Sequence, residues 1–110
     1  IGSRIARSIV NHRRLLGGFY QIEQLGEIRL KAEKLRSWFS VDAGKIHRIN
    51  INKASVERMM HHPYISYYQA KVIAEYRKKK GKVRDLKQLM LYEEFTPADF
   101  ERMAPYVCYD

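Results

Sequence analysis

The chain has 110 residues, a formal net charge of +9 and a single cysteine. Its length fits one compact domain or two very small ones, and a hydrophobic fraction of 45% with 30% charged residues excludes a disordered chain. The lone Cys108 excludes an internal disulfide, and no apolar run is as long as a membrane span. The excess of basic residues indicates a polyanionic partner, with nucleic acid favoured over an anionic membrane surface.

Apolar residues recur at helical spacing, which predicts a helical fold without a sustained strand. In the first half of the chain, Ile5 and Ile9 lie on one face of a helix that ends at Gly17, where a left-handed cap is expected. The segment from Ile46 to Ile51 is expected to be briefly extended.

The second half is predicted to hold short helices separated by turns. Ser55, with Asn52 as the alternative, is expected to be the N-cap of a helix over Val56–Met60, which Pro63 ends. A longer helix follows and ends at Gly81. The start signals of the last two helices are Asp85 as one N-cap and Thr96 as the other, with Pro97 at the first helical position.

The chain contains two copies of one pattern. At an offset of 64 positions, Ile9 pairs with Ile73 and Gly17 with Gly81, and at an offset of 68 the segment 33–39 pairs with 101–107. The first copy has no counterpart of residues 49–64, so we expect it to be truncated at its N-terminus. The predicted organisation is a truncated first unit over residues 1–42, a linker over 43–48 and a second unit over 49–110.

The second copy opens with Ile49-Asn50-Ile51-Asn52-Lys53-Ala54-Ser55 and continues through Tyr76-Arg77 to Gly81. This pattern resembles the double helix-hairpin-helix module of ComEA-type competence DNA receptors. The resemblance implies an all-α fold of tandem double helix-hairpin-helix units, and sequence-independent binding of double-stranded DNA in DNA uptake or in repair. It also implies a membrane-anchored or periplasmic location, with the cytoplasm as the alternative.

In that family, a Gly-hydrophobic-Gly turn between two helices offers backbone amides to a DNA phosphate. Glycine lets the backbone approach closely, and successive N–H groups at a helix N-terminus attract an anion. The equivalent turns here are Ile1-Gly2-Ser3 and Tyr64-Ile65-Ser66, in which only Gly2 remains a glycine. We expect Ser66 to cap the next helix and the N–H groups of its turn to remain available. In the last turn, Glu94-Phe95-Thr96, the glutamate is expected to repel phosphate.

Basic residues are concentrated in one stretch of the chain. Residues 71–87 include eight basic and two acidic residues, whereas residues 88–110 include one basic and five acidic residues. This asymmetry predicts a basic patch that contacts phosphates, and the alternative for Arg77–Lys82 is a solvated helix end. The candidate DNA-binding residues are Ile1, Gly2, Ser3, Arg4 and Arg7 in the first copy, and Tyr64, Ile65, Ser66, Lys71, Arg77, Lys78, Lys79, Lys80 and Lys82 in the second.

Other kinds of site have less support. His61 and His62 point in different directions on a helix and have no Cys or Asp at ligand spacing, so no metal is expected. No nucleophile motif or phosphate-binding loop occurs, and we expect neither an enzyme nor a cofactor nor a small-molecule substrate. Tyr64 and Tyr67 stay open between stacking on bases and packing against helices. The alternative function is a protein-interaction or structural helix-hairpin-helix module that no longer binds DNA.

Overall fold

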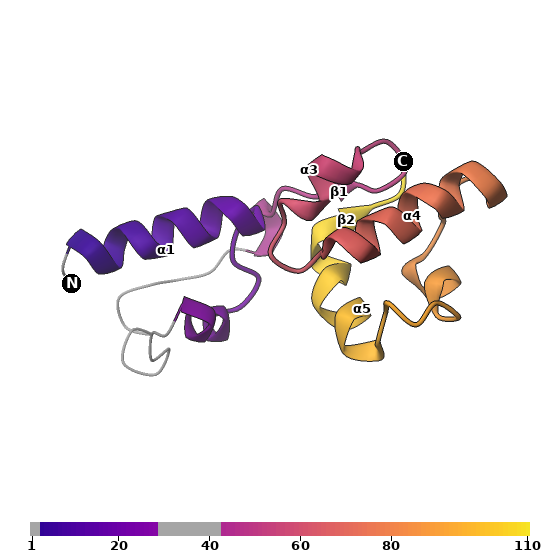
Figure 1. The fold of residues 1–110 in the computed structure, drawn as a ribbon. Helices are drawn as coiled ribbons and strands as arrows, with labels where there is room; N and C mark the ends of the chain where they lie inside the picture. The colour runs from indigo at the N-terminus through magenta and orange to yellow at the C-terminus, as the bar shows by residue number, and fades with distance from the viewer. Residues whose placement is uncertain (1–2, 29–42) are drawn as a thin grey trace. The chain divides into compact units, whose positions relative to one another are not determined.

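A computed structural model describes residues 3–28 and 43–110, and these residues are mostly helical (Figure 1). The all-α class expected from the sequence is confirmed. The chain divides into two compact units, Ile1–His47 and Arg48–Asp110, so the division falls inside the segment 43–48. Within the described part, none of the helices combines the length and the apolarity needed to cross a membrane.

The first unit is built on one long amphipathic helix, α1 (Ser3–Leu16). Its buried residues are Ile9 and Leu16, and Leu25 of the 3₁₀ helix η1 (Ile22–Ile28) is buried as well. His12 of α1 is joined to Glu27 of η1 by a contact of 2.8 Å between Nε2 and Oε1. A short 3₁₀ turn, η2 (Ala43–Lys45), follows the residues that are not described.

The end of α1 requires a glycine at one position. Gly17 has a φ of +92°, and the N–H of Gly18 donates to the carbonyl oxygen of Arg13 at 2.9 Å, as expected of a glycine-capped helix. A Cβ on Gly17 would lie 2.5 Å from the carbonyl oxygen of His47. The Gly17 carbonyl oxygen accepts the His47 N–H at 2.8 Å, so this close approach of two backbone segments is what excludes a side chain.

The second unit contains two short helical pairs. Its elements are β1 (Ile49–Asn50), α3 (Val56–Met60), α4 (Tyr67–Lys80), η3 (Leu86–Leu89), α5 (Pro97–Met103), η4 (Ala104–Tyr106) and β2 (Val107–Cys108). The two strands pair in parallel, with Ile49 opposite Val107, so the end of the unit returns to its beginning. The extended stretch expected at Ile46–Ile51 is thus present only at β1, and β2 was not predicted, because a two-residue strand has no alternation to detect.

Local capping bonds start α3, α4, η3 and α5, as the sequence predicts, whereas η4 has no side-chain cap. Ser55, Ser66, Asp85 and Thr96 are the N-caps of α3, α4, η3 and α5. Asn52, the alternative cap of α3, has a different role: its Nδ2 donates to the carbonyl oxygen of Val83, and its Oδ1 accepts the Val83 N–H, both at 2.8 Å. Asn52 therefore ties the loop before α3 to the segment that follows α4.

The core of the second unit is apolar and includes one residue from each of its hairpin turns. Ile51, Met59, Ile73, Val83 and Leu89 are fully buried. The hydrophobic residue of each hairpin turn is also buried, with Ile65 3% and Phe95 6% exposed. These two residues thus belong to the core although they lie in the turns between successive helices.

Equivalent elements repeat in the structure at two spacings, 30 and 64 positions, of which only the second was expected from the sequence. Residues Tyr64–Ser66 and Glu94–Thr96, which are 30 positions apart, form equivalent turns with equivalent caps. The helices α1 and α4 correspond at the offset of 64. Both have 14 residues, and α4 begins and ends 64 positions after α1. Much of the first copy lies outside the described residues, so the tandem of two double units stays a prediction.

Replacing Asn52 by Ala tests the tie between the two loops. The substitution leaves the buried N–H and carbonyl oxygen of Val83 without their partners, so we expect the free energy of unfolding to fall by about 2 kcal/mol. Denaturant unfolding of the whole chain measures this loss, with Lys53→Ala as the control at an exposed neighbour. Equal stabilities for the two variants would contradict the structural role of Asn52.

Candidate nucleic-acid interface

The two hairpin turns of the second unit are bonded in the same way. In the first turn, the Ser66 N–H donates to Oε1 of Gln69, and the Gln69 N–H donates to Oγ of Ser66. In the second turn, the Thr96 N–H donates to Oδ2 of Asp99, and the Asp99 N–H donates to Oγ1 of Thr96. Each helix that follows a turn is therefore capped reciprocally by residues three positions apart.

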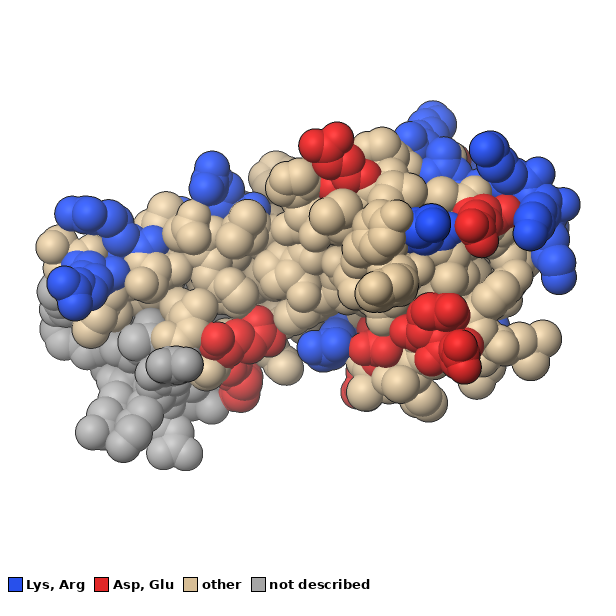
Figure 2. Space-filling model, in the orientation of Figure 1, with Lys and Arg blue, Asp and Glu red and all other residues tan. Residues whose placement is uncertain are grey.

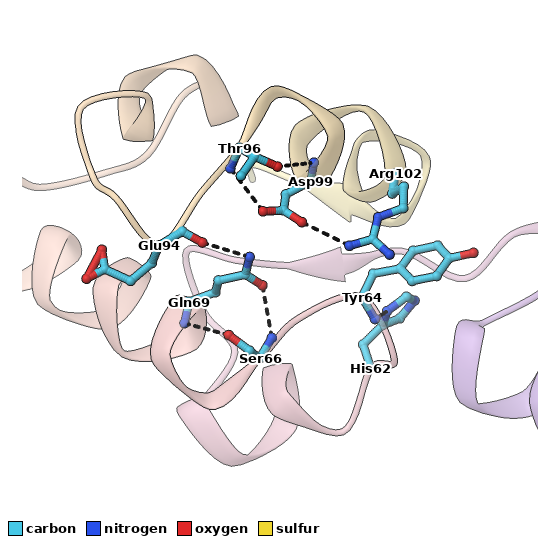
Figure 3. A network of polar contacts seen from close by, with 8 residues as sticks. All are labelled: His62, Tyr64, Ser66, Gln69, Glu94, Thr96, Asp99 and Arg102. Atoms are coloured by element: carbon cyan, nitrogen blue, oxygen red, sulfur yellow. Dashed lines mark hydrogen bonds and ion pairs between the residues drawn. The ribbon is translucent and has the colours of Figure 1, made fainter. Parts of the chain in front are cut away.

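Side chains from each turn also reach the other turn (Figure 3). Nε2 of Gln69 donates to the carbonyl oxygen of Glu94 at 3.0 Å. In the opposite direction, Arg102 of α5 places its guanidinium 5.0 Å from the centre of the Tyr64 ring while it donates to Oδ1 of Asp99 at 2.9 Å. These reciprocal contacts, which we call the hairpin clasp, hold the two turns together.

The backbone amides of the first turn are already used within the protein. The Tyr64 N–H donates to Nδ1 of His62 at 3.0 Å, the Ile65 N–H to the carbonyl oxygen of His62 at 3.1 Å, and the Ser66 N–H to Gln69 at 3.0 Å. The expectation that the N–H groups of this turn remain available is therefore wrong. A phosphate would have to displace an internal acceptor at each of these positions, which leaves a buried acceptor unpaired.

The structure decides the open question for Tyr64. Its side chain is only 7% exposed, and its ring contacts His62 and Tyr106 at centroid distances of 5.4 and 5.7 Å. Packing, not base stacking, is the role of Tyr64. Tyr67 remains 46% exposed, and the ammonium of Lys71 lies 5.6 Å from the centre of its ring, so the question stays open for Tyr67.

The second turn carries negative charge. Glu93 and Glu101 are exposed and Glu94 is half-buried. Burial raises the pKa of the Asp99 carboxyl, but the hydrogen bonds from the Thr96 backbone, the Arg102 guanidinium and the Thr96 side chain together hold it below its ordinary value of 3.8. Asp99 therefore remains ionised at neutral pH, and this turn repels a phosphate, as expected from Glu94.

The basic candidates of the second unit lie at the other end of α4. Lys78, Lys79, Lys80 and Lys82 are all exposed, and Figure 2 shows basic surface gathered over the end of this helix at the right of the view. A helix of 14 residues is about 21 Å long, so this end is far from the first turn, which precedes α4. Figure 1 likewise shows α5 beside the first turns of α4 and not beside the last.

Arg77 differs from the lysines that follow it. It is only partly exposed, and its Nη1 donates to the carbonyl oxygen of Ala54 at 2.5 Å, so it joins α4 to the loop before α3. We assign Arg77 a structural role. Lys71, the remaining candidate, is exposed near the start of α4 and lies apart from the basic end.

Lys53 is a basic residue of this region that the sequence does not single out. It lines one hollow together with Lys78 and Lys82. In the sequence it was only part of the Ile49–Ser55 motif, and 25 positions separate it from Lys78. The Asn52 and Arg77 bonds that bring the two segments together are long-range, and no local pattern indicates them.

The candidates of the first unit are only partly described. Ile1 and Gly2 lie outside the described residues. Ser3, Arg4 and Arg7 are exposed on α1, and all three line a second hollow together with Arg14. This face of α1 is basic.

The described residues contain no group of three or more His, Cys, Asp or Glu side chains placed to hold a metal ion. Cys108 is a free thiol and is half-buried in β2.

Two helical pairs joined by hairpin turns, with a buried hydrophobic residue in each turn, define a helix-hairpin-helix domain. The family model for the helix-hairpin-helix motif matches residues 44–108, and the chain belongs to this family. Helix-hairpin-helix motifs are generally associated with non-specific DNA binding, which supports a nucleic-acid partner. No curated protein and no solved structure matches the chain.

Asp99→Asn tests the charge in the clasp, because asparagine keeps the oxygen that accepts the Thr96 N–H. A carboxyl whose pKa is lowered in the folded state stabilises the fold above its unfolded pKa, here its ordinary value of 3.8. This stabilisation is lost as the pH falls through the folded pKa. We expect the variant to be about 0.5–1 kcal/mol less stable than the wild type at pH 7. The difference should disappear in acid, where Asp99 is protonated in both states.

The measurement is the free energy of unfolding of both proteins at pH 7 and in strong acid. Glu101→Gln, which removes an exposed carboxylate from the same helix, is the control and should have the smaller effect at pH 7. A difference between Asp99→Asn and the wild type that is the same at both pH values would show that the charge does not stabilise the clasp.

Proposed function

We propose that the chain is a binding protein, not an enzyme, and that it binds double-stranded DNA without sequence preference through the basic end of α4. The observation that carries the proposal is the group of exposed lysines at Lys78–Lys80 and Lys82, on a domain of a family generally associated with non-specific DNA binding. Lysine ammonium groups attract phosphate oxygens without reading bases.

The state of the hairpins supports this choice of surface. The amides of the first turn donate internally, and the second turn carries Glu93 and Glu94. Neither turn combines unpaired hydrogen-bond donors with positive charge, whereas the end of α4 has several exposed lysine side chains. The proposed contacts are therefore those of Lys and Arg side chains with phosphates, and not the hairpin amides expected from the sequence.

The proposal also includes the biological process in which the DNA is bound. The resemblance of Ile49–Ser55 to ComEA-type competence receptors favours DNA uptake, and repair is the alternative. The basic face of α1, with Arg4 and Arg7, is a further surface for the same polyanion.

A second candidate function is binding of another protein by the second hairpin. Two large apolar side chains next to this turn are exposed, Met90 at 61% and Leu91 at 98%. They precede Glu93 and Glu94, so the surface is both apolar and acidic, which suits a basic, partly apolar partner better than DNA.

Titration of the full chain with two unrelated duplexes of equal length, at several salt concentrations, tests the first function. We expect the two affinities to agree within about threefold and to fall with a log–log salt slope of about −2 to −4, since each phosphate contact contributes about −0.9. A single strand of the same length should give a shallower slope.

Two results would contradict this function. One is the absence of binding at low salt despite the charge of +9. The other is a strong preference for one duplex, since backbone contacts carry no sequence information. The absence of binding would favour the protein-binding alternative, whereas a preference for one duplex would show binding that reads the DNA sequence.

A further inference from the structure

A groove runs between the loop before α3 and the end of α4, and it has a volume of about 690 Å³. One side is formed by the loop residues Asn52–Ser55 and by Val56 at the start of α3, and the other by α4 and the segment that follows it. The charged residues that line it are Lys53, Glu75, Arg77, Lys78, Lys82 and Asp110. Basic side chains therefore outnumber acidic ones two to one.

Three bonds hold the walls of this groove in place. Arg77 donates to the carbonyl oxygen of Ala54, which fixes the loop against α4. Asn52 donates to and accepts from Val83, which fixes the segment after α4 against the same loop. Because all three bonds are internal to the protein, the walls of the groove are held in place without a ligand.

The lysines of the groove, unlike Arg77, take no part in holding its walls. Within the described part of the chain, the side chains of Lys53, Lys78 and Lys82 form no hydrogen bond or ion pair, and all three residues are exposed. Their ammonium groups come from three separate segments and line one channel. Three cations on a fixed frame suit an extended polyanion that passes along an open groove.

We propose that this groove is the phosphate track of the domain: it holds a run of nucleic-acid backbone, with Lys53, Lys78 and Lys82 contacting the phosphates. The proposal rests on the proposed function and assigns its contacts to particular residues. Lys79, Lys80 and Lys87 belong to the same basic stretch but do not line the groove. These three lysines add to the positive electrostatic potential around the DNA without contacting it.

Two triple variants of equal charge separate the groove from the general field. One is Lys53→Gln with Lys78→Gln and Lys82→Gln, and the other is Lys79→Gln with Lys80→Gln and Lys87→Gln. Both are made in the full chain, checked for an unchanged thermal midpoint, and titrated with the same random-sequence duplex across a salt series.

We expect the groove variant to bind at least about tenfold more weakly than the control variant and to flatten the log–log salt slope by about 2 to 3, against less than 1 for the control. Glu75→Gln removes a negative charge from the groove, so it should strengthen binding about two- to threefold.

The possible failures are distinguishable. Equal weakening by the two triple variants would overturn the groove and leave DNA binding by a diffuse basic field intact. Unchanged affinity in both variants would overturn the groove and place the DNA on another surface, such as α1. Failure of the wild type itself to bind any duplex at low salt would overturn the groove together with the proposed function.

Discussion

The side chain of Gln69 is the contact on which the arrangement of the second unit depends. It is 7% exposed, and both ends of its amide are bonded: Oε1 accepts the Ser66 N–H at the cap of α4, and Nε2 donates to the carbonyl oxygen of Glu94 in the other turn. One residue thus starts the long helix and fixes the second hairpin against the first. The contact of Arg102 with Tyr64 closes the same connection from the other side.

Because of this contact, the two ends of α4 have different roles. At the beginning of α4, backbone amides and side chains form the bonds that hold the two hairpins together. Acidic residues surround the second turn. At the end of α4, about 21 Å away, exposed lysines extend into solvent. The turns of this helix-hairpin-helix fold therefore have a structural role. The surface suited to a polyanion lies at the opposite end of α4.

Features that depend on a few neighbouring residues were predictable from the sequence. The caps Ser55, Asp85 and Thr96 each bond an amide within three positions, and the end of α1 at Gly17 follows from a local need for positive φ. The class of fold followed from the same local signals together with the helical spacing of apolar residues.

Features that depend on distant partners were not predictable. The bond of Gln69 with Glu94 spans 25 positions and that of Arg77 with Ala54 spans 23. Without these contacts, Arg77 resembles the lysines beside it, and Tyr64 resembles an exposed turn residue. The sequence therefore indicated a basic stretch, most of which is exposed in the structure, but could not divide it into structural, groove-lining and outward-facing members.

The most direct measurement of where DNA binds is a titration of the ¹⁵N-labelled chain with a short duplex, followed through the backbone amide signals. Binding in the groove predicts that the largest shifts fall at Lys53, Ala54 and residues 77–82, while the signals of residues 64–66 and 94–96 keep their positions. The largest shifts at the two hairpin turns, with the end of α4 unaffected, would contradict it.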